Sequence, residues 1–289
     1  MATLRDIRAR IKGVQNTQQI TKAMKMVAAA KLRRAQERVV NARPYARKIS
    51  ETLAHLITEE DLKSNPYLSR REAKNTAVVV VTADRGLCGA FNANIIKESI
   101  KQLDEYSNTA SQVHIFCIGR KAAEFFSKRN SNISAKKIGI FSELKFEDAL
   151  LITDEITGNF LNGIFDRVIL VYNEFKSIIQ QKIRVEQFLP FPLDNNSAEE
   201  KNIDYIYEPD RQFIFNYLLP KHLRAQIWRI LLESNAAELA ARMTAMDNAT
   251  TNAKELIRTL QLKYNKERQA AITKEILEIV SGANALKTE

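Results

Sequence analysis

The residues best placed for chemistry lie in one loop, residues 82–92, which follows a run of mostly β-branched residues at 77–81. In α/β folds, the loop after the first strand is a common place to bind a phosphate group. This loop contains neither G-x-G-x-x-G nor G-x-x-x-x-G-K-[ST], and it has no lysine placed to reach a phosphate. The sequence therefore gives little support for a nucleotide site and predicts no cofactor.

Cys88 is the candidate nucleophile in this loop. A nucleophilic cysteine needs a base beside it, but the three histidines, at 55, 114 and 222, have no local relation to Cys88. The only other cysteine is Cys117, so the chain has no disulfide framework, and no H-x-x-H, H-E-x-x-H or C-x-x-C cluster indicates a metal site. A structural or partner-contact role for Cys88 is the stronger alternative, and the sequence predicts no catalytic residues.

The loop belongs to a central segment, residues 75–192, in which predicted strands and helices alternate. The apolar run at 77–81 is typical of a strand buried on both faces of a parallel sheet. The further expected strands are 113–118, 138–140, 167–172 and 182–188, and the expected helices are 92–106, 121–128 and 147–160. This alternation predicts a doubly wound α/β domain.

A polar connection, residues 193–210, follows this domain. Tyr205-Ile206-Tyr207 predicts a short edge strand before Pro209. The two tyrosines are flanked by acidic residues, a composition that suits a docking surface. An aromatic pair can equally belong to a core, so both interpretations of Tyr205 and Tyr207 stay open.

The last segment, residues 211–289, reads as one long helix, because no glycine occurs in it before Gly282. Its apolar residues keep a 3.5-residue period, with Thr250 filling one gap, at Leu239, Met243, Met246, Ala253, Ile257, Leu260 and Tyr264. Such a period predicts a coiled-coil seam. At about 1.5 Å per residue the helix would be on the order of 110 Å long, and a helix of that length needs a partner helix.

The seam does not continue to the end of the chain. After Tyr264 the period is lost, and it resumes out of phase at Ile272 and Ile276. A phase slip of this kind distorts or ends a coiled coil. Arg268 and Gln269 stand where the period fails, so we expect them to turn outward as the helix leaves its partner.

The partner helix is predicted at the other end of the chain, within residues 1–60. Its spaced apolar residues are Leu4, Ile7, Ile11, Val14, Ile20, Met24, Val27, Ala28, Leu32, Ala35 and Val39. Pro44 should kink or end this helix. The antiparallel arrangement is favoured, because the central domain must receive one helix and begin the other. The first helix would be roughly 80 Å long, so the C-terminal helix should extend beyond it.

The net charge of +10 is concentrated in the first helix, where residues 1–48 carry thirteen basic side chains against Asp6 and Glu37. Such a surplus indicates either a solvated helix face or a surface that meets an acidic partner, nucleic acid or protein. Nucleic acid is the weaker of the two partners, because Tyr45 is the only aromatic residue among these bases. The chain has no run of eighteen apolar residues, so we expect no direct membrane insertion.

Four stretches together resemble one known family. Residues 1–11 and 20–28 are similar to the N-terminus of the gamma subunit of F-type ATP synthases, and residues 84–92 resemble that family's central loop. Residues 272–283 resemble its C-terminal signature. The stretches occur in the family's order and span the whole chain.

The resemblance implies a non-catalytic rotary shaft. In this family the paired terminal helices turn inside a ring of three alpha and three beta subunits, and the α/β domain is a foot on the membrane ring of c subunits, beside the epsilon subunit. Proton flow turns the rotor, and the asymmetric shaft drives the beta subunits through their binding states. The expected location is peripheral, on the cytoplasmic face of a bacterial plasma membrane or on an inner organelle membrane.

The resemblance also implies which residues meet partners. It places Arg268 and Gln269 against the beta subunits as a catch that engages one of them at a time, the alternative being a solvated helix surface. The C-terminal tip would sit in an apolar sleeve, which suits Ile272 and Ile276. The expected contact residues are Met24, Lys25, Cys88, Tyr205, Tyr207, Arg268, Gln269, Ile272 and Ile276.

Overall fold

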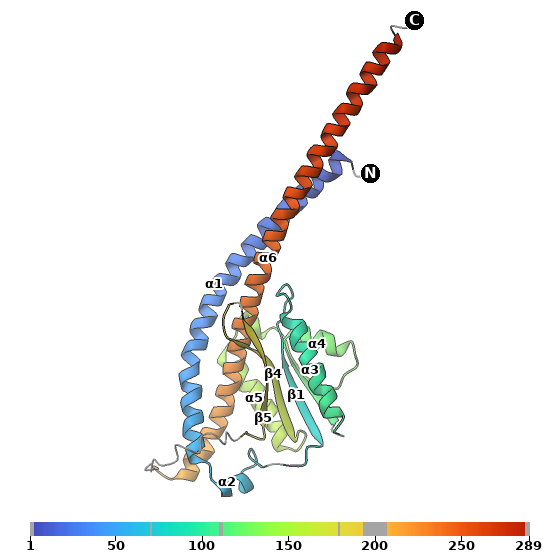
Figure 1. The fold of residues 1–289 in the computed structure, drawn as a ribbon. Coiled ribbons are helices and arrows are strands. Elements are labelled where there is room, and N and C mark those ends of the chain that lie inside the picture. Colours follow the sequence, from blue (N-terminus) through green and yellow to red (C-terminus); the bar gives the residue numbers. More distant parts are fainter. Residues whose placement is uncertain (1–2, 70, 110–111, 179, 193–206, 287–289) are drawn as a thin grey trace. The chain divides into compact units, whose positions relative to one another are not determined.

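The computed structural model describes residues 3–69, 71–109, 112–178, 180–192 and 207–286. The chain divides into two compact units, one formed by residues 28–242 and the other by residues 1–27 together with 243–289. Two long helices, α1 (Leu4–Leu56) and α6 (Arg211–Leu286), contribute residues to both units (Figure 1).

The larger unit contains a five-stranded sheet in the order β3-β2-β1-β4-β5 (Figure 1). Its strands are β1 (Asn75–Val81), β2 (Gln112–Ile118), β3 (Ile133–Lys137), β4 (Arg167–Phe175) and β5 (Gln181–Leu189). The first four are parallel, and β5 pairs antiparallel with β4. The chain runs outward from β1 to β3 and then returns to β4 on the other side of β1. This is the doubly wound arrangement that the sequence predicts.

The β-branched run of β1 forms the centre of the sheet and is buried on both faces. Val78 and Val80 pack in an apolar cluster with residues of α3 (Phe91–Ser107) and α4 (Arg120–Ser127). Right-handed crossovers place α3 and α4 on one face of the sheet and α5 (Phe146–Leu161), which leads back to β4, on the other. The sheet thus has a helical layer on each side.

A second apolar cluster joins the C-terminal end of α1 to the N-terminal end of α6. Leu53 and Leu56 of α1 pack with Phe215 and Leu219 of α6, and all four side chains are almost fully buried. Burying a leucine or phenylalanine side chain contributes about 1.5–3 kcal/mol. These helix ends are therefore held within the same compact unit as the sheet.

The smaller unit is an antiparallel helix pair. Three polar contacts join its helices: Arg8 Nη2 to Tyr264 Oη (2.8 Å), Thr21 Oγ1 to Thr250 Oγ1 (2.8 Å) and Lys25 Nζ to Asp247 Oδ1 (2.6 Å). Residue numbers rise along α1 as they fall along α6, so the predicted antiparallel direction is confirmed. The seam predicted for α6 is also confirmed in this unit, where the buried side chains are Met246, Ala253, Ile257 and Leu260.

The seam predicted for α1 is wrong at two positions. Ile20 and Val27 are exposed, with 60% and 56% of their surface accessible. Thr21 and Ala28, each one residue further along the chain, are buried instead. The face of α1 that meets α6 is therefore rotated by one residue from the face chosen on apolar character.

Pro44 does not end α1, which continues to Leu56. A proline inside a helix removes one backbone donor and displaces the carbonyl four residues earlier, here that of Val40. Val40 is exposed, so solvent can replace the lost donor. Of the two outcomes expected at Pro44, a kink or an end, the end is therefore wrong, and the expected extent of the helix to about Leu56 is confirmed.

The short strand expected at residues 138–140 is also misplaced. The strand is β3, which ends at Lys137, and residues Ile140–Ser142 form a 3-10 helix. Between them Gly139 has a φ of +89°, in the left-handed region that ends a strand and favours glycine. The apolar pair Ile138 and Ile140 suggested a strand, but this backbone turn interrupts it.

Candidate functional site

The loop that follows β1 lies where the strand order reverses, between β1 and β4, the usual ligand position in doubly wound folds. Several of its polar groups are engaged within the chain. Asp84 Oδ1 accepts hydrogen bonds from the backbone N–H of Arg120 (3.0 Å) and of Gly139 (2.9 Å). Arg242 of α6, paired with Glu238, donates to the carbonyl of Gly86 (2.7 Å). The loop is thus tied to the rest of the larger unit.

Cys88 lies inside this loop with 2% of its surface exposed. Its Sγ accepts a hydrogen bond from Asn92 Nδ2 (3.1 Å). Burial, with a smaller contribution from Glu238, raises the pKa of the thiol. A protonated thiol is a poor nucleophile, so Cys88 acts here as a packing residue. The exposed apolar side chain of the loop is Leu87, which the sequence did not single out.

The expected contact residues Met24 and Lys25 lie on α1 in the smaller unit. Met24 is half-buried, and Lys25 forms its ion pair with Asp247 at a partly exposed position. In the smaller unit, the large apolar residues that α1 exposes to solvent are Ile20, Met26 and Val27. Ile20 and Val27 are seven residues apart on one helix face, and the sequence had assigned both to the seam.

The C-terminal tip of α6 is exposed on all described sides. Arg268 and Gln269 are solvent-accessible, as the phase slip predicts. Ile272, Ile276 and Ile279 are spaced for one helix face, and all three are about half exposed or more. An apolar face of this kind on a single helix marks a surface that another chain covers.

The two tyrosines that precede α6, predicted to form either a docking surface or part of a core, have different outcomes. Tyr205 lies outside the described residues, and so does most of the predicted edge strand. Tyr207 packs against the cluster of Leu53 and Phe215, which is the core alternative. The exposed aromatics of this region are Phe213 and Tyr217, whose rings stack with centroids 6.5 Å apart. Their i, i+4 spacing on a helix was the signal available in the sequence.

Metal centres and membrane-spanning helices are two other classes of functional site. Across the described ranges, no group of three or more histidine, cysteine, aspartate or glutamate side chains is arranged to hold a metal ion. Within the same part of the chain, no helix has the length and apolar character needed to cross a membrane. The candidate functional surfaces are the exposed helix faces described above, because large apolar side chains gather there.

Known proteins similar to this chain identify its family. A family model described as ATP synthase matches residues 3–286. The ATP synthase gamma chain of Chlorobaculum tepidum is 54% identical over 291 residues, which is 99% of this chain and 100% of the relative. The chain belongs to the ATP synthase gamma chain family. This membership confirms the resemblance drawn from the four sequence stretches.

Solved structures show the same gamma-chain fold. A chain in the structure of the Tetrahymena thermophila mitochondrial ATP synthase central stalk and c-ring is 29% identical, with a TM-score of 0.61 over 80% of this chain and 99% of that one. A chain of the Euglena gracilis mitochondrial ATP synthase is 21% identical, with a TM-score of 0.69 over 98% and 94% of the two chains. The gamma-chain architecture of long terminal helices and a mixed sheet is therefore shared over nearly the whole length.

Proposed function

We propose that this chain is the central shaft of a proton-translocating F-type ATP synthase. It couples rotation of a membrane ring to conformational change at the catalytic sites of the beta subunits, and it has no catalytic site of its own. Its partners are three alpha and three beta subunits, an epsilon subunit and the ring of c subunits. It is held peripherally at the membrane through these proteins, on the cytoplasmic face in a bacterium.

The observation that carries this proposal is the unpartnered end of α6. Arg8 of α1 lies opposite Tyr264, and α1 begins about one helical turn from this contact, at Leu4. Among the described residues, α6 then continues to Leu286 without a partner helix. Ile272 and Ile276 on this single helix face solvent. An isolated amphipathic helix of this kind is stabilised when a surrounding surface buries its apolar face, which is what a ring of alpha and beta subunits provides. Similarity to a central-stalk chain supports the same reading.

Purification of the tagged chain from its own membranes tests the proposal. We expect native mass spectrometry to find it in a heteromeric ATPase that contains three alpha and three beta subunits. Recovery of the chain with nucleic acid and without ATPase subunits would instead support the basic coiled-coil alternative. A nuclease-treated sample controls for adventitious binding to the basic face of α1.

Cys88→Ser should leave ATP turnover by the assembled complex nearly unchanged, because Cys88 is a buried packing residue with a raised thiol pKa. Cys117→Ser, in β2, is the matched control, since it removes a thiol from the same apolar cluster without altering the loop. The measurement is the steady-state rate per assembled complex. A loss of several orders of magnitude confined to Cys88→Ser would revive a catalytic role for the thiol.

The exposed aromatic pair Phe213 and Tyr217, near the N-terminal end of α6, suits docking on the rotor ring or the epsilon subunit. Replacing Phe213 and Tyr217 together by serine should lower ATP-driven proton pumping more than ATP hydrolysis, because both rings are exposed and their loss spares the core. Tyr207→Ala should instead lower the stability of the chain and both activities in proportion, since this ring packs on the apolar cluster. Equal losses of pumping and hydrolysis in the Phe213 and Tyr217 variant would rule out the docking role.

A further inference from the structure

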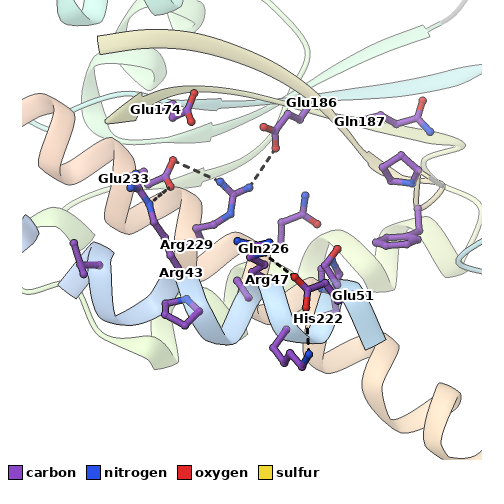
Figure 2. Close-up of a pocket in the computed structure, with 17 residues that line it drawn as sticks. Arg43, Arg47, Glu51, Glu174, Glu186, Gln187, His222, Gln226, Arg229 and Glu233 are labelled. Atoms are coloured by element: carbon purple, nitrogen blue, oxygen red, sulfur yellow. Dashed lines mark hydrogen bonds and ion pairs between the residues drawn. The ribbon is translucent and has the colours of Figure 1, made fainter. Parts of the chain in front are cut away.

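A polar cavity of about 1100 Å³ lies in the larger unit, between α1, α6 and the β4–β5 edge of the sheet (Figure 2). Among the described residues, three buried polar atoms that line it have no hydrogen-bond partner: His222 Nδ1, Gln226 Oε1 and Glu233 Oε2. All three belong to one face of α6. Polar groups of α6 therefore face the cavity, although apolar residues at the same level of the helix, such as Ile227 and Ile230, are buried.

Charged side chains cross this cavity (Figure 2). From α6, Arg229 reaches Glu186 of β5 (3.4 Å) and the hydroxyl of Tyr172 on β4 (3.4 Å). From α1, Arg43 reaches Glu233 of α6 (3.4 Å) and donates to the carbonyl of Phe175 at the end of β4 (3.1 Å). Arg229 also lies 3.5 Å from Glu233, which closes the chain of contacts. Both long helices are thereby linked to the sheet.

The cost of burying these charges argues that the arrangement does more than stabilise the chain. The Glu233 side chain is 3% exposed and that of Arg229 is 23% exposed. Burial raises the pKa of Glu233, and Arg229 and Arg43 oppose that rise, so the carboxylate depends on its arginine partners to stay charged. Replacing a buried ion pair by well-packed apolar residues often preserves or increases stability. A set of contacts that joins α1, α6, β4 and β5 is better explained by what it connects.

The geometry around Arg229 suits a connection that carries load. Its guanidinium lies at nearly equal distances, 3.4 to 3.5 Å, from acceptors on β4, β5 and α6. A hydrogen bond weakens steeply as it lengthens, but the attraction between charges falls only as the inverse of distance. A small shift of α6 against the sheet would change the distances from Arg229 to Tyr172 and Glu186, but the attraction to the Glu186 charge would persist, and Glu233 would move with Arg229 because both belong to α6. The link would then hold over a range of displacements.

We propose that Arg229 and Glu233, with Arg43 and Glu186, form an electrostatic link that transmits torque from the sheet domain to the two long helices across the cavity. The inference rests on the proposed shaft function and assigns these residues a positioning role in it. When the ring turns the foot, the link carries the motion from β4 and β5 into α6 and, through Glu233 and Arg43, into α1.

The test replaces both buried charges at once, Arg229→Met with Glu233→Met, in the complete enzyme reconstituted into vesicles. The two buried charges are removed together, so neither is left without the other. Glu186 keeps its hydrogen bond from the Tyr172 hydroxyl and Arg43 keeps the Phe175 carbonyl, and both side chains are partly exposed, so we expect the chain to fold and assemble. ATP hydrolysis should be retained, whereas protons pumped per ATP hydrolysed should fall severalfold. Arg229→Lys keeps the charge but loses the planar fork, and it should give an intermediate ratio. If the double variant fails to assemble, Glu233→Gln, which preserves shape, is measured in its place.

The matched control is Arg224→Gln with Asp154→Asn, which removes an exposed ion pair between α6 and α5 (2.9 Å) and should leave the pumping ratio unchanged. A wild-type ratio in an assembled Arg229 and Glu233 variant would overturn the proposal, and so would equal losses of hydrolysis and pumping with a less stable chain. Failure of the shaft function itself is distinguishable, because the wild-type chain would then be absent from the proton-pumping complex.

Discussion

Replacing Gly119 by alanine should destabilise the α/β domain by roughly 3–5 kcal/mol, a large part of the stability of a typical domain. The backbone at Gly119 has a φ of +95°, which side chains other than glycine rarely adopt. An added Cβ would lie 2.1 Å from the carbonyl oxygen of Thr82. Thr82 cannot move aside easily, because its N–H donates to the carbonyl of Ile118 (2.8 Å) and its hydroxyl accepts from Ala122 N–H (2.9 Å).

Gly139→Ala is the matched control for this prediction. Gly139 also has a positive φ, +89°, but an added Cβ would meet no atom within 4 Å. The stability lost in Gly139→Ala should reflect backbone strain alone, about 1 kcal/mol or somewhat more. Urea unfolding of the full-length chain measures both variants. If Gly119→Ala costs no more than Gly139→Ala, the close approach to Thr82 is not what requires glycine.

The second large effect concerns catalysis by the complete enzyme. Arg268→Ala with Gln269→Ala should lower both ATP hydrolysis and ATP synthesis, while the amount of assembled complex stays the same. Both side chains are exposed on the chain by itself, where an ion pair would contribute only about 0.2–1 kcal/mol. Buried against a beta subunit, the loss of one hydrogen-bonded partner costs about 2–5 kcal/mol. The lower limit corresponds to about a 30-fold loss of rate.

A control for this variant lies one to two turns earlier on the same helix. Gln261→Ala with Lys263→Ala removes one amide and one positive charge from exposed positions and should leave both rates near the wild type. Assembly is quantified by native mass spectrometry before the rates are compared. Wild-type rates in both directions for the Arg268 and Gln269 variant would leave those residues as a solvated helix surface.

The seam of α6 could be predicted from the sequence because its spacing is regular in apolar residues. From Leu239 to Tyr264 the pattern alternates steps of four and three without interruption, and only Thr250 is polar. Periodic burial of this kind is a local property of the sequence. The β1 strand was predictable for a similar reason, since residues 77–81 are all apolar and all buried.

The seam of α1 could not be predicted in the same way, because polar residues occupy several of its positions partway along the helix. The unbroken steps of four and three run through Ile7, Ile11, Val14, Gln18, Thr21, Lys25, Ala28, Leu32, Ala35 and Val39. None of these ten side chains is fully exposed. The polar members Thr21 and Lys25 are accepted in the seam because α6 presents Thr250 and Asp247 to them. A pattern based only on apolar residues includes Ile20 and Val27 instead. The side chains of α6 that face Thr21 and Lys25 are distant in the sequence, so the local pattern does not reveal them.

The candidate surfaces also include positions that the local sequence predicts and positions that it does not. The outward position of Arg268 followed from a loss of period that the sequence displays. The core position of Tyr207 and the link between Arg229 and Glu186 depend on residues far away in the chain, and no spacing rule connects such residues. Composition indicated that the first helix is basic, but only the fold shows that Arg43 is engaged by Glu233.

The pair of threonine hydroxyls in the smaller unit helps to set how much of α6 extends past α1. If the two helices slid by one heptad, Thr21 would face Met243 or Ile257, and Thr250 would face Val14 or Ala28. Either shift would move the hydroxyls from each other onto apolar neighbours. The same slide would lengthen or shorten the free end of α6 by about 10 Å. Two hydroxyl groups far from the C-terminal tip thus contribute to the length of the free end of α6. A substitution at Thr21 or Thr250 would change that length as well as the stability of the helix pair.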